Sequence, residues 1–356
     1  MKLFTIGPVQ MYERTLKQKS EQVPYFRNSS FSEMMLETDA LIKLALNTDS
    51  STHCMYLTAS GTAAMEAAVI NVFNKNDKLL VVAGGTFGKR FSQICEIHDI
   101  PHTDITLEHG ERFTEKHLAA YEGKGYTGFL VNLDETSTGQ LYDINLISAF
   151  CRRNGCVLLV DAITSFLCDE YSMDGFGADV TIMSSQKGLC VSPGVSIVAI
   201  NDRTFAQRVM QNSPATLYFD FKDYDRNIMR GQTPFTPAVG IMYEIHDFLL
   251  YLKEKGISRH LAEINERAKY FRSRISEIGG SLPDYPLSNA ITPVIFEKPI
   301  ARNLYLGLAE KYGMIVNPTG GSNEEYQIRV SHIGDLALGD YDELIKAIKE
   351  IISDLC

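Results

Sequence analysis

The sequence predicts an α/β protein with a mostly parallel sheet covered by helices on both faces, followed by a smaller α+β unit. Three observations lead to this prediction. Short apolar runs rich in β-branched residues alternate with segments whose apolar residues recur every three or four positions. One such run, Val157–Val160, is apolar throughout, which is typical of a strand buried on both faces. The chain has 356 residues, which is long enough for one large and one smaller domain.

The predicted strands of the large sheet all lie between residues 55 and 200, and each ends at a turn signal. They are Met55–Thr58, Leu79–Val82, Gly128–Asn132, Val157–Asp161, Val180–Met183 and Ser196–Ile200. Helical spacing separates them, for example over Ala63–Phe73 and Ile144–Cys151. This alternation of strand and helix predicts parallel pairing.

The pattern changes near Ile241, where a long helical segment begins that is broken near Gly256 and ends near Ile278. We expect a domain junction at the start of this segment. The rest of the chain predicts a small α+β unit, with strands near Ile291–Phe296 and Gln327–Val330 and helices near Arg302–Tyr312 and Tyr341–Ser353.

Charge and hydropathy exclude several classes of partner. The formal net charge of -10 repels phosphate backbones and anionic lipid surfaces, so we expect no nucleic acid and no membrane partner. No apolar run reaches the roughly 20 residues that span a bilayer. The N-terminus meets Gly7 and Pro8 too early for a signal peptide, which predicts a cytoplasmic protein.

The seven cysteines form no CxxC pair and have no histidine at the spacing of a zinc site. We interpret them as reduced thiols, and the sequence predicts no metal site.

Reactive side chains follow two of the predicted strands. One strand ends in Asp161, and the next ends in a turn that carries Gln186, Lys187 and Gly188. Ligands of open parallel sheets gather at the carboxyl ends of the strands. A carboxylate and an amine are therefore expected at one edge of the sheet, where they can share a ligand.

A short turn of small residues, Ser60-Gly61-Thr62, lies directly before the predicted helix Ala63–Phe73. Ser60 suits a helix N-cap, and Gly61 permits close approach of a ligand to the backbone. Free N–H groups at a helix start attract phosphate. Turns of this kind are also common without any ligand.

Two further loops could contact a flat ligand. Phe87 stands on a loop flanked by glycines, where its ring could stack on a heteroaromatic ring or simply cover the core. The turn Asp134–Gly139 supplies hydroxyl groups, although an ordinary loop between a strand and a helix would look the same.

In order and spacing, these segments resemble the class V aminotransferases of fold type I. The relevant branch contains the alanine–glyoxylate, serine–pyruvate and 2-aminoethylphosphonate–pyruvate transaminases. The similarity runs from Thr5–Pro8 to Ile328–Val330, nearly the whole chain. It implies a seven-stranded sheet, an N-terminal segment over residues 1–20 that lines the site, a large cofactor-binding domain over 21–245 and a small domain over 246–356.

The resemblance implies that pyridoxal 5'-phosphate is the cofactor. It makes Lys187 the lysine that forms the Schiff base, Asp161 the partner of the pyridine nitrogen and Phe87 the stacking residue. A buried amine at a strand end can also move the proton at the substrate α-carbon. A carboxylate at the ring nitrogen keeps the ring protonated, and the ring can then act as an electron sink.

By the same resemblance, Thr136 lies near the ring and Ile163 packs opposite Phe87. Gln186 joins Ser60, Gly61 and Thr62 around the phosphate. Thr236 resembles a residue that reaches the neighbouring subunit's site, which implies a homodimer with shared active sites. One departure is Thr233, which stands where alanine–glyoxylate members often have a tyrosine.

The resemblance also implies which residues bind the substrate. Arg329 matches the arginine that holds the substrate carboxylate, and Gly7 and Pro8 should line the same pocket. A guanidinium can form two parallel hydrogen bonds with a carboxylate. Without the resemblance, an arginine at this place would be interpreted as a surface strand residue.

The predicted function is transfer of an amino group from a small amino acid, of the alanine or serine type, to glyoxylate or pyruvate. Transfer from 2-aminoethylphosphonate to pyruvate is the alternative, because these enzymes share the same motifs. A cysteine desulfurase would need a loop cysteine, and residues 317–326 contain none. A non-catalytic relative would be expected to lack Lys187 or Asp161, and a nicotinamide dehydrogenase would need a GxGxxG turn after its first strand.

Overall fold

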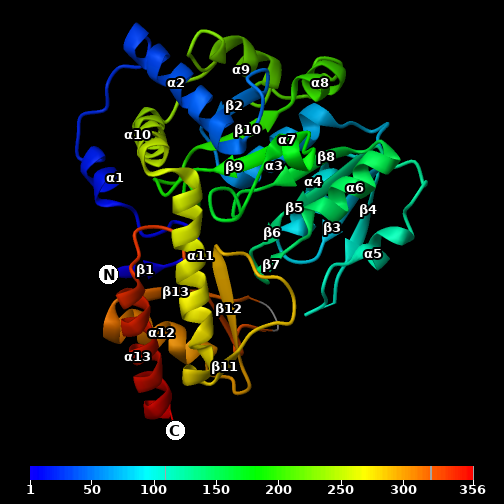
Figure 1. The fold of residues 1–356 in the computed structure, drawn as a ribbon. Helices are drawn as coiled ribbons and strands as arrows, with labels where there is room; N and C mark the ends of the chain where they lie inside the picture. The colour runs from blue at the N-terminus through cyan, green and yellow to red at the C-terminus, as the bar shows by residue number, and fades with distance from the viewer. Residues whose placement is uncertain (109, 321–322, 356) are drawn as a thin grey trace.

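A seven-stranded sheet organises most of the protein (Figure 1). The computed structural model describes residues 1–108, 110–320 and 323–355. The strand order is β2-β10-β9-β8-β5-β3-β4, and β10 is antiparallel to both of its neighbours while the other pairs are parallel. The strands are β2 (His53–Leu57), β3 (Leu79–Ala83), β4 (His102–Thr106), β5 (Gly128–Asn132), β8 (Val157–Asp161), β9 (Val180–Ser184) and β10 (Ser196–Ile200). The predicted mostly parallel, seven-stranded sheet is confirmed.

Strand β4 was not predicted from the sequence. It forms one edge of the sheet, and of its five residues only Ile105 is buried. An edge strand needs few apolar side chains because one side of it faces solvent. Its polar sequence therefore lacks the apolar run that predicts the other six strands, including β2 at the opposite edge.

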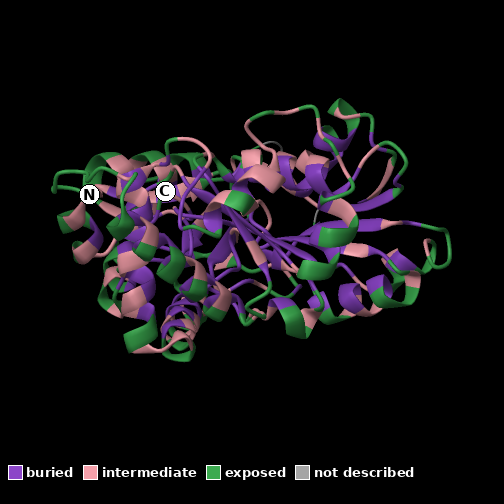
Figure 2. Ribbon diagram, turned by 90° about the horizontal axis from the view of Figure 1, so that it is seen from above, coloured by how far each residue is buried: buried purple, intermediate pink, exposed green. Residues whose placement is uncertain are grey.

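Helices cover both faces of the large sheet. Side chains of β3 alternate between two cores: Leu80 and Val82 pack in one, and Leu79 and Val81 in the other. The first core includes residues of α2 (Ser29–Leu46), α6 (Ile144–Asn154) and α10 (Val239–Lys255), and the second includes residues of α3 (Gly61–Val72) and α4 (Gly88–Ile97). Figure 2 shows the buried strands running through the middle, with exposed residues on the surrounding helices.

A second sheet, with strand order β1-β13-β14-β12-β11, lies near the two termini. Its strands are β1 (Lys2–Phe4), β11 (Gly280–Ser281), β12 (Ile291–Phe296), β13 (Met314–Pro318) and β14 (Gln327–Ser331). It packs with helices α11 (Ile257–Ser273), α12 (Ala301–Tyr312) and α13 (Leu338–Leu355) around a third core. Strand β1 pairs in parallel with β13, so the start of the chain belongs to the sheet formed by its end.

The predicted helix break at Gly256 separates α10 from α11. Gly256 has a φ of 88°, which other residues rarely adopt. The remaining elements are α1 (Glu13–Gln18), α5 (Glu115–Ala119), β6 (Asp134–Glu135), β7 (Gln140–Leu141), α7 (Met173–Phe176), α8 (Asp202–Thr204), η1 (Phe205–Val209), α9 (Phe221–Ile228) and η2 (Ile275–Ile278). Within the described ranges, the length and apolar character needed to cross a bilayer are found in none of the helices.

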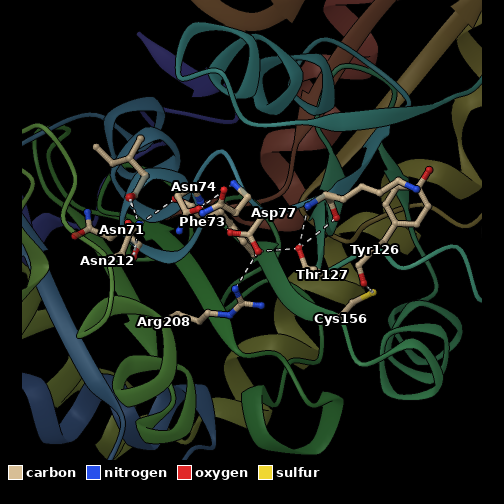
Figure 3. Close-up of polar contacts among 12 residues, drawn as sticks. Asn71, Phe73, Asn74, Asp77, Tyr126, Thr127, Cys156, Arg208 and Asn212 are labelled. Atoms are coloured by element: carbon tan, nitrogen blue, oxygen red, sulfur yellow. Dashed lines mark hydrogen bonds and ion pairs between the residues drawn. The ribbon is translucent and has the colours of Figure 1, made fainter.

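Hydrogen bonds and an ion pair join the segments before β3 and β5, at the amino ends of these strands (Figure 3). Asp77, which precedes β3, accepts hydrogen bonds from the Thr127 hydroxyl at 2.8 Å and from Arg208 at 2.9 Å. The backbone N–H of Asn74 donates to its other oxygen at 2.9 Å. With its carboxylate satisfied in this way, we assign Asp77 a structural role.

Candidate active site

Lys187 lies in the turn that follows β9, at the carboxyl end of the strand. Its side chain is buried, and its Nζ donates a hydrogen bond to Thr164 Oγ1 at 3.2 Å. The next residue must be glycine, because a Cβ on Gly188 would come within 1.9 Å of the Phe166 carbonyl oxygen. The packing of this turn against the loop after β8 thus fixes where the amine points.

Burial changes the acidity of this amine. It lowers the pKa of Lys187 to about 8, and the carboxyl groups of Asp134 and Asp161 oppose the shift only in part. About a tenth of the amine is therefore neutral at pH 7, far more than for an ordinary lysine. Only the neutral form is nucleophilic and able to accept a proton.

Asp161 ends β8, the strand beside β9, and is held at both carboxylate oxygens. Oδ1 accepts a hydrogen bond from the Ile163 backbone N–H at 2.8 Å, and Oδ2 accepts one from the Asn132 side-chain amide. Burial raises the pKa of Asp161 to about 6, while these two hydrogen bonds and Lys187 act in the opposite direction. The carboxylate is consequently oriented and mostly ionised at neutral pH.

The N-terminus of α3 forms another part of the site. Ser60 caps this helix, and its Oγ accepts from the Ala63 N–H at 3.3 Å. Backbone amides of the first turn have no acceptor within a helix, so those of Gly61 and Thr62 are available to an anion. Arg90 donates to Thr62 Oγ1 at 2.7 Å, which adds a cation to this end of the site.

Phe87 stands on a loop that is held by a buried carboxylate. Glu135 accepts hydrogen bonds from the backbone N–H groups of Phe87 at 3.3 Å and Gly88 at 2.9 Å. Lys187 Nζ lies 5.8 Å from the centroid of the Phe87 ring. The aromatic face and the amine therefore border the same space.

Nine residues predicted from the sequence line a single cavity. They are Ser60, Gly61, Thr62, Phe87, Thr136, Asp161, Ile163, Gln186 and Lys187. Thr136 Oγ1 lies 2.7 Å from Thr164 Oγ1, the atom that accepts from Lys187. Gln186 Oε1 accepts from Ser184 Oγ at 2.6 Å, which leaves its amide hydrogens free to donate.

The predicted substrate residues Gly7, Pro8 and Arg329 are not among those that line this cavity, but Gly7 and Arg329 lie next to residues that do. A Cβ on Gly7 would lie 3.3 Å from side-chain atoms of Gln186 and Lys187, so the N-terminal segment reaches the lysine. Arg329 donates from Nη1 to the Thr136 carbonyl at 2.7 Å and from Nη2 to the Pro318 carbonyl at 2.7 Å. Pro8, next to Gly7, accepts a hydrogen bond at its carbonyl from the Thr5 hydroxyl at 2.5 Å.

Thr236 is not brought to this cavity within its own chain. It is exposed, in the segment before α10. Thr233 is buried, and its hydroxyl donates to the Phe235 carbonyl at 2.7 Å, so its proton is already engaged.

Four polar residues at the site were not predicted from the sequence: Asn132, Asp134, Thr164 and Arg90. The first three line the cavity. Asn132 ends β5 as Asp161 ends the neighbouring β8, and the two occupy paired positions in the sheet. A search for polar residues at strand ends could have found it. Asp134 belongs to a turn whose sequence indicates a supply of hydroxyl groups. That its carboxyl group lines the cavity is visible only in the packed structure.

The chain belongs to the class V aminotransferase family, because the model of that family, "Aminotransferase class-V", matches residues 10–317. It is similar to a protein named "Soluble hydrogenase 42 kDa subunit" from Anabaena cylindrica, with 27% identity over 98% of this chain and 92% of that one. It is also similar to the alanine–glyoxylate aminotransferase of Callithrix jacchus, with 28% identity over 84% of this chain and 75% of that one. A bifunctional phosphonoacetaldehyde hydrolase/aminoethylphosphonate transaminase from Clostridioides difficile is 26% identical over 88% of this chain and 50% of its own length.

Solved structures show the same fold. An aspartate aminotransferase from Thermus thermophilus superposes with a TM-score of 0.91, at 24% identity and full coverage of both chains. An alanine–glyoxylate aminotransferase from Nostoc sp. gives a TM-score of 0.91, at 23% identity over 98% of this chain and 94% of that one. The protein is therefore a pyridoxal-phosphate-dependent transferase of fold type I, as the resemblance implied.

The residues around the cavity fit pyridoxal phosphate. The cavity offers an amine for the aldehyde, an oriented carboxylate for the ring nitrogen and a helix N-terminus for the phosphate. Room for the ligand depends on Gly61, because a Cβ there would come within 2.6 Å of Ile163 Cδ1.

Proposed function

We propose that this protein transfers an amino group from a small amino acid, of the alanine or serine type, to a small 2-keto acid, glyoxylate or pyruvate. The observation that carries the proposal is that Lys187 and Asp161 line one cavity, while Arg329 donates a hydrogen bond to the carbonyl of Thr136, a residue that also lines it. A transaminase needs an amine, a ring-nitrogen partner and a carboxylate clamp in this combination.

In this proposal Lys187 holds the cofactor and moves the proton at the substrate α-carbon. When bound, the cofactor supplies an electron sink for the charge that proton removal leaves on that carbon. Asp161 keeps the ring nitrogen protonated from its position at the end of β8. Phe87 and Ile163 border the two faces of the ring, while Ser60, Gly61, Thr62 and Gln186 donate to the phosphate.

We propose that Arg329 binds the substrate carboxylate, with Gly7 and Pro8 forming the adjacent wall. Burial lowers the pKa of Arg329, yet a guanidinium remains charged at neutral pH. Its Nε has no hydrogen-bond partner among the described residues. In this structure two backbone carbonyls accept hydrogen bonds from the Arg329 guanidinium. A substrate carboxylate would replace these neutral acceptors with a charged one.

The relatives favour small substrates with glyoxylate as one acceptor, since two curated relatives and one structural neighbour are named as alanine–glyoxylate aminotransferases. The second candidate is aminoethylphosphonate–pyruvate transfer, which the bifunctional relative's name supports.

A half-reaction assay tests the substrate. The holoenzyme is mixed separately with alanine, serine, aspartate and 2-aminoethylphosphonate, and the change of cofactor absorbance to the amine form is recorded. Alanine or serine should give the change, and Lys187→Ala should abolish it. A change with 2-aminoethylphosphonate but with neither alanine nor serine would make the second candidate correct.

We also propose a homodimer in which Thr236 donates to the phosphate in the partner's site. Its exposure, and its position outside the cavity of its own chain, support this arrangement. Inactive Lys187→Ala and inactive Thr236→Ala proteins, mixed under conditions of subunit exchange, should regain some activity in hybrid dimers. Exchange without recovery would place the whole site within one chain.

The domain division and the location in the cell also remain proposals. The separate core around the small sheet supports a small domain within residues 246–356 beside a large domain over 21–245, although Phe248, Leu249 and Leu252 of α10, beyond that boundary, still pack in the core of the large sheet. The N-terminal segment 1–20 brings Gly7 next to Gln186 and Lys187 and contributes β1 to the small sheet. A cytoplasmic location rests on the sequence alone.

A further inference from the structure

Asp134 is a buried carboxyl group without a partner in the candidate active site. It lines the cavity and is 3% exposed. Neither of its carboxyl oxygens accepts a hydrogen bond from any described residue. No described lysine, arginine or histidine forms an ion pair with it, so its hydrogen-bonding capacity is unused.

Asp134 reaches the cavity because side chains alternate between two faces along the end of β5 and the residues that follow it. Asn132, Asp134 and Thr136 all line the cavity, while Leu133 between them is buried in the core. Asn132 bonds to Asp161, and the Thr136 hydroxyl is paired with Thr164. Asn132 Oδ1 also lacks a partner, but its amide nitrogen is engaged, so of these three side chains Asp134 is the one that forms no hydrogen bond with a described residue.

An ionised carboxylate is costly in such surroundings. A buried charge with no partner shifts its protonation equilibrium toward the neutral form. Burial raises the pKa of Asp134 well above its usual range, and nearby Asp169 and Glu135 add to the shift. Lys187 opposes it, as does the Ser288 hydroxyl, which donates its proton to Asp169. The titratable groups that interact with it are Glu135, Asp169, Lys187, Arg329, Arg272, Cys168, Tyr142 and Tyr285.

The contrast with Asp169 identifies Asp134 as the group available to a ligand. Asp169 is equally buried, but it accepts from Ser288 Oγ at 2.5 Å and from the Asn289 N–H at 2.8 Å. It does not line the cavity. The protein therefore satisfies one of these carboxyl groups internally and leaves the other facing the ligand space.

We propose that Asp134 is a further ligand-contacting residue, a neutral carboxylic acid that donates a hydrogen bond to a negatively charged oxygen of the bound ligand. This inference rests on the proposed function. Two ligands present such an oxygen: the cofactor, on its pyridine ring, and the substrate, in its carboxylate. In both cases Asp134 would donate its proton in a hydrogen bond to a negatively charged oxygen.

The test compares Asp134→Asn, which keeps a donor but cannot ionise, with Asp134→Leu, which has no donor. Asp169→Asn is the matched control for removal of a buried carboxyl group outside the cavity. Apoprotein is titrated with pyridoxal phosphate, and the amine form of the holoenzyme is titrated with glyoxylate and pyruvate. Reductive labelling of Lys187 in wild type and each variant tests the proposed function separately, because its failure in wild type would refute the cofactor assignment itself.

We expect Asp134→Asn to leave both affinities within about threefold of wild type, since an amide N–H replaces the acid O–H. The leucine variant should weaken one ligand by about ten- to a hundredfold, the scale of one hydrogen bond to a charged group. Loss of cofactor affinity would identify the ring oxygen as the acceptor, and loss of keto-acid affinity alone would identify the substrate. The Asp169→Asn control should bind both ligands as wild type does.

Three results would overturn the inference. One is a leucine variant that binds both ligands as tightly as wild type. Another is an asparagine variant that loses as much affinity as the leucine variant, since that would mean an ionised carboxylate is required. If the leucine variant does not fold, the asparagine variant still decides. The pH profile of its bound cofactor's visible absorbance should match that of wild type between pH 6 and 9. A displacement of this profile by about one pH unit or more contradicts a neutral Asp134.

Discussion

Asn132 and Asp161 occupy paired positions at the ends of the adjacent parallel strands β5 and β8, and the Asn132 amide donates a hydrogen bond to the Asp161 carboxylate. The Ile163 N–H holds the other carboxylate oxygen at 2.8 Å. Asp161 is therefore oriented by the sheet itself, before any cofactor is bound. The hydrogen bonds at these strand ends hold the carboxylate that we propose as the partner of the pyridine nitrogen.

Replacement of Asp161 by asparagine should raise the stability of the apoprotein and lower the activity of the holoenzyme. Burial raises its pKa from 3.8 to about 6, so the folded apoprotein binds this proton more tightly than the unfolded chain does. The contribution of this group to stability is thus fully present below pH 4 and is lost as the pH rises through 6. Apoprotein with Asp161→Asn should be more stable than wild type at pH 8 by about 3 kcal/mol, with the difference disappearing toward pH 4.

Denaturant unfolding of both apoproteins at pH 4.5, 6 and 8 measures this difference. The same variant should bind pyridoxal phosphate more weakly and turn over slower by orders of magnitude, because the ring nitrogen loses its charged partner. A variant with near-normal turnover would exclude the proposed role of Asp161. A stability difference that does not depend on pH would exclude its raised pKa.

Lys187 should react with the cofactor at a lower pH than an ordinary lysine. Burial lowers its pKa to about 8, so the rate at which pyridoxal phosphate attaches to the apoprotein should rise with pH around a midpoint near 8. Because Asp161 raises this pKa, the midpoint should fall further in Asp161→Asn. Stopped-flow absorbance from pH 6 to 10 gives both values. A midpoint above about 9.5, close to that of a free lysine, would show that the amine is not desolvated.

Gly61 should be required for cofactor binding because of one atom of Ile163. A Cβ at position 61 would lie 2.6 Å from Ile163 Cδ1, an atom that valine lacks. Gly61→Ala should weaken pyridoxal phosphate about tenfold or more, the scale of a displaced side chain at a packed site. Ile163→Val should restore much of the affinity in the double variant.

Gly339→Ala provides the matched control, because a Cβ there meets no atom within 4 Å. Its affinity for pyridoxal phosphate should equal that of wild type when each apoprotein, including the Gly61 and Ile163 variants, is titrated with the cofactor and protein fluorescence is recorded. An unrescued double variant would mean that the backbone around Gly61, and not the contact with Ile163, limits binding.

Arg329→Lys should weaken carboxylate substrates while leaving the cofactor in place. A lysine cannot provide two parallel hydrogen bonds, and removal of one partner of a desolvated ion pair costs about 2–5 kcal/mol. The KM for glyoxylate or pyruvate should rise accordingly, and the absorption spectrum of the resting holoenzyme should not change. Unaltered keto-acid affinity would remove Arg329 from the substrate site.

The sequence predicted those features whose cause is local. The apolar run of β8 and the polar residue that ends it predicted both a buried strand and the position of Asp161. Six of the seven strands and the helix break at Gly256 were found for the same reason. The edge strand β4 was missed because only Ile105 of its residues is buried. The pairing of β1 with β13 joins the two ends of the chain, which local periodicity cannot indicate.

At the site, nine of the residues supplied by the resemblance line one cavity, whereas Asn132 and Asp134, which also line it, were not predicted. An asparagine at a strand end has many ordinary explanations, and its partner Asp161 is 29 residues away in sequence. The free oxygens of Asp134 are a property of the packed structure alone. The role of Thr236 depends on a second chain and stays a prediction.

The most direct test of the account is covalent capture of the cofactor. Borohydride reduction of the holoenzyme, followed by digestion and peptide mass analysis, should find the pyridoxyl group on the peptide that contains Lys187, and Lys187→Ala should carry no label. A label on any other lysine, or a wild-type protein that binds pyridoxal phosphate without attaching it to Lys187, would contradict the central claim.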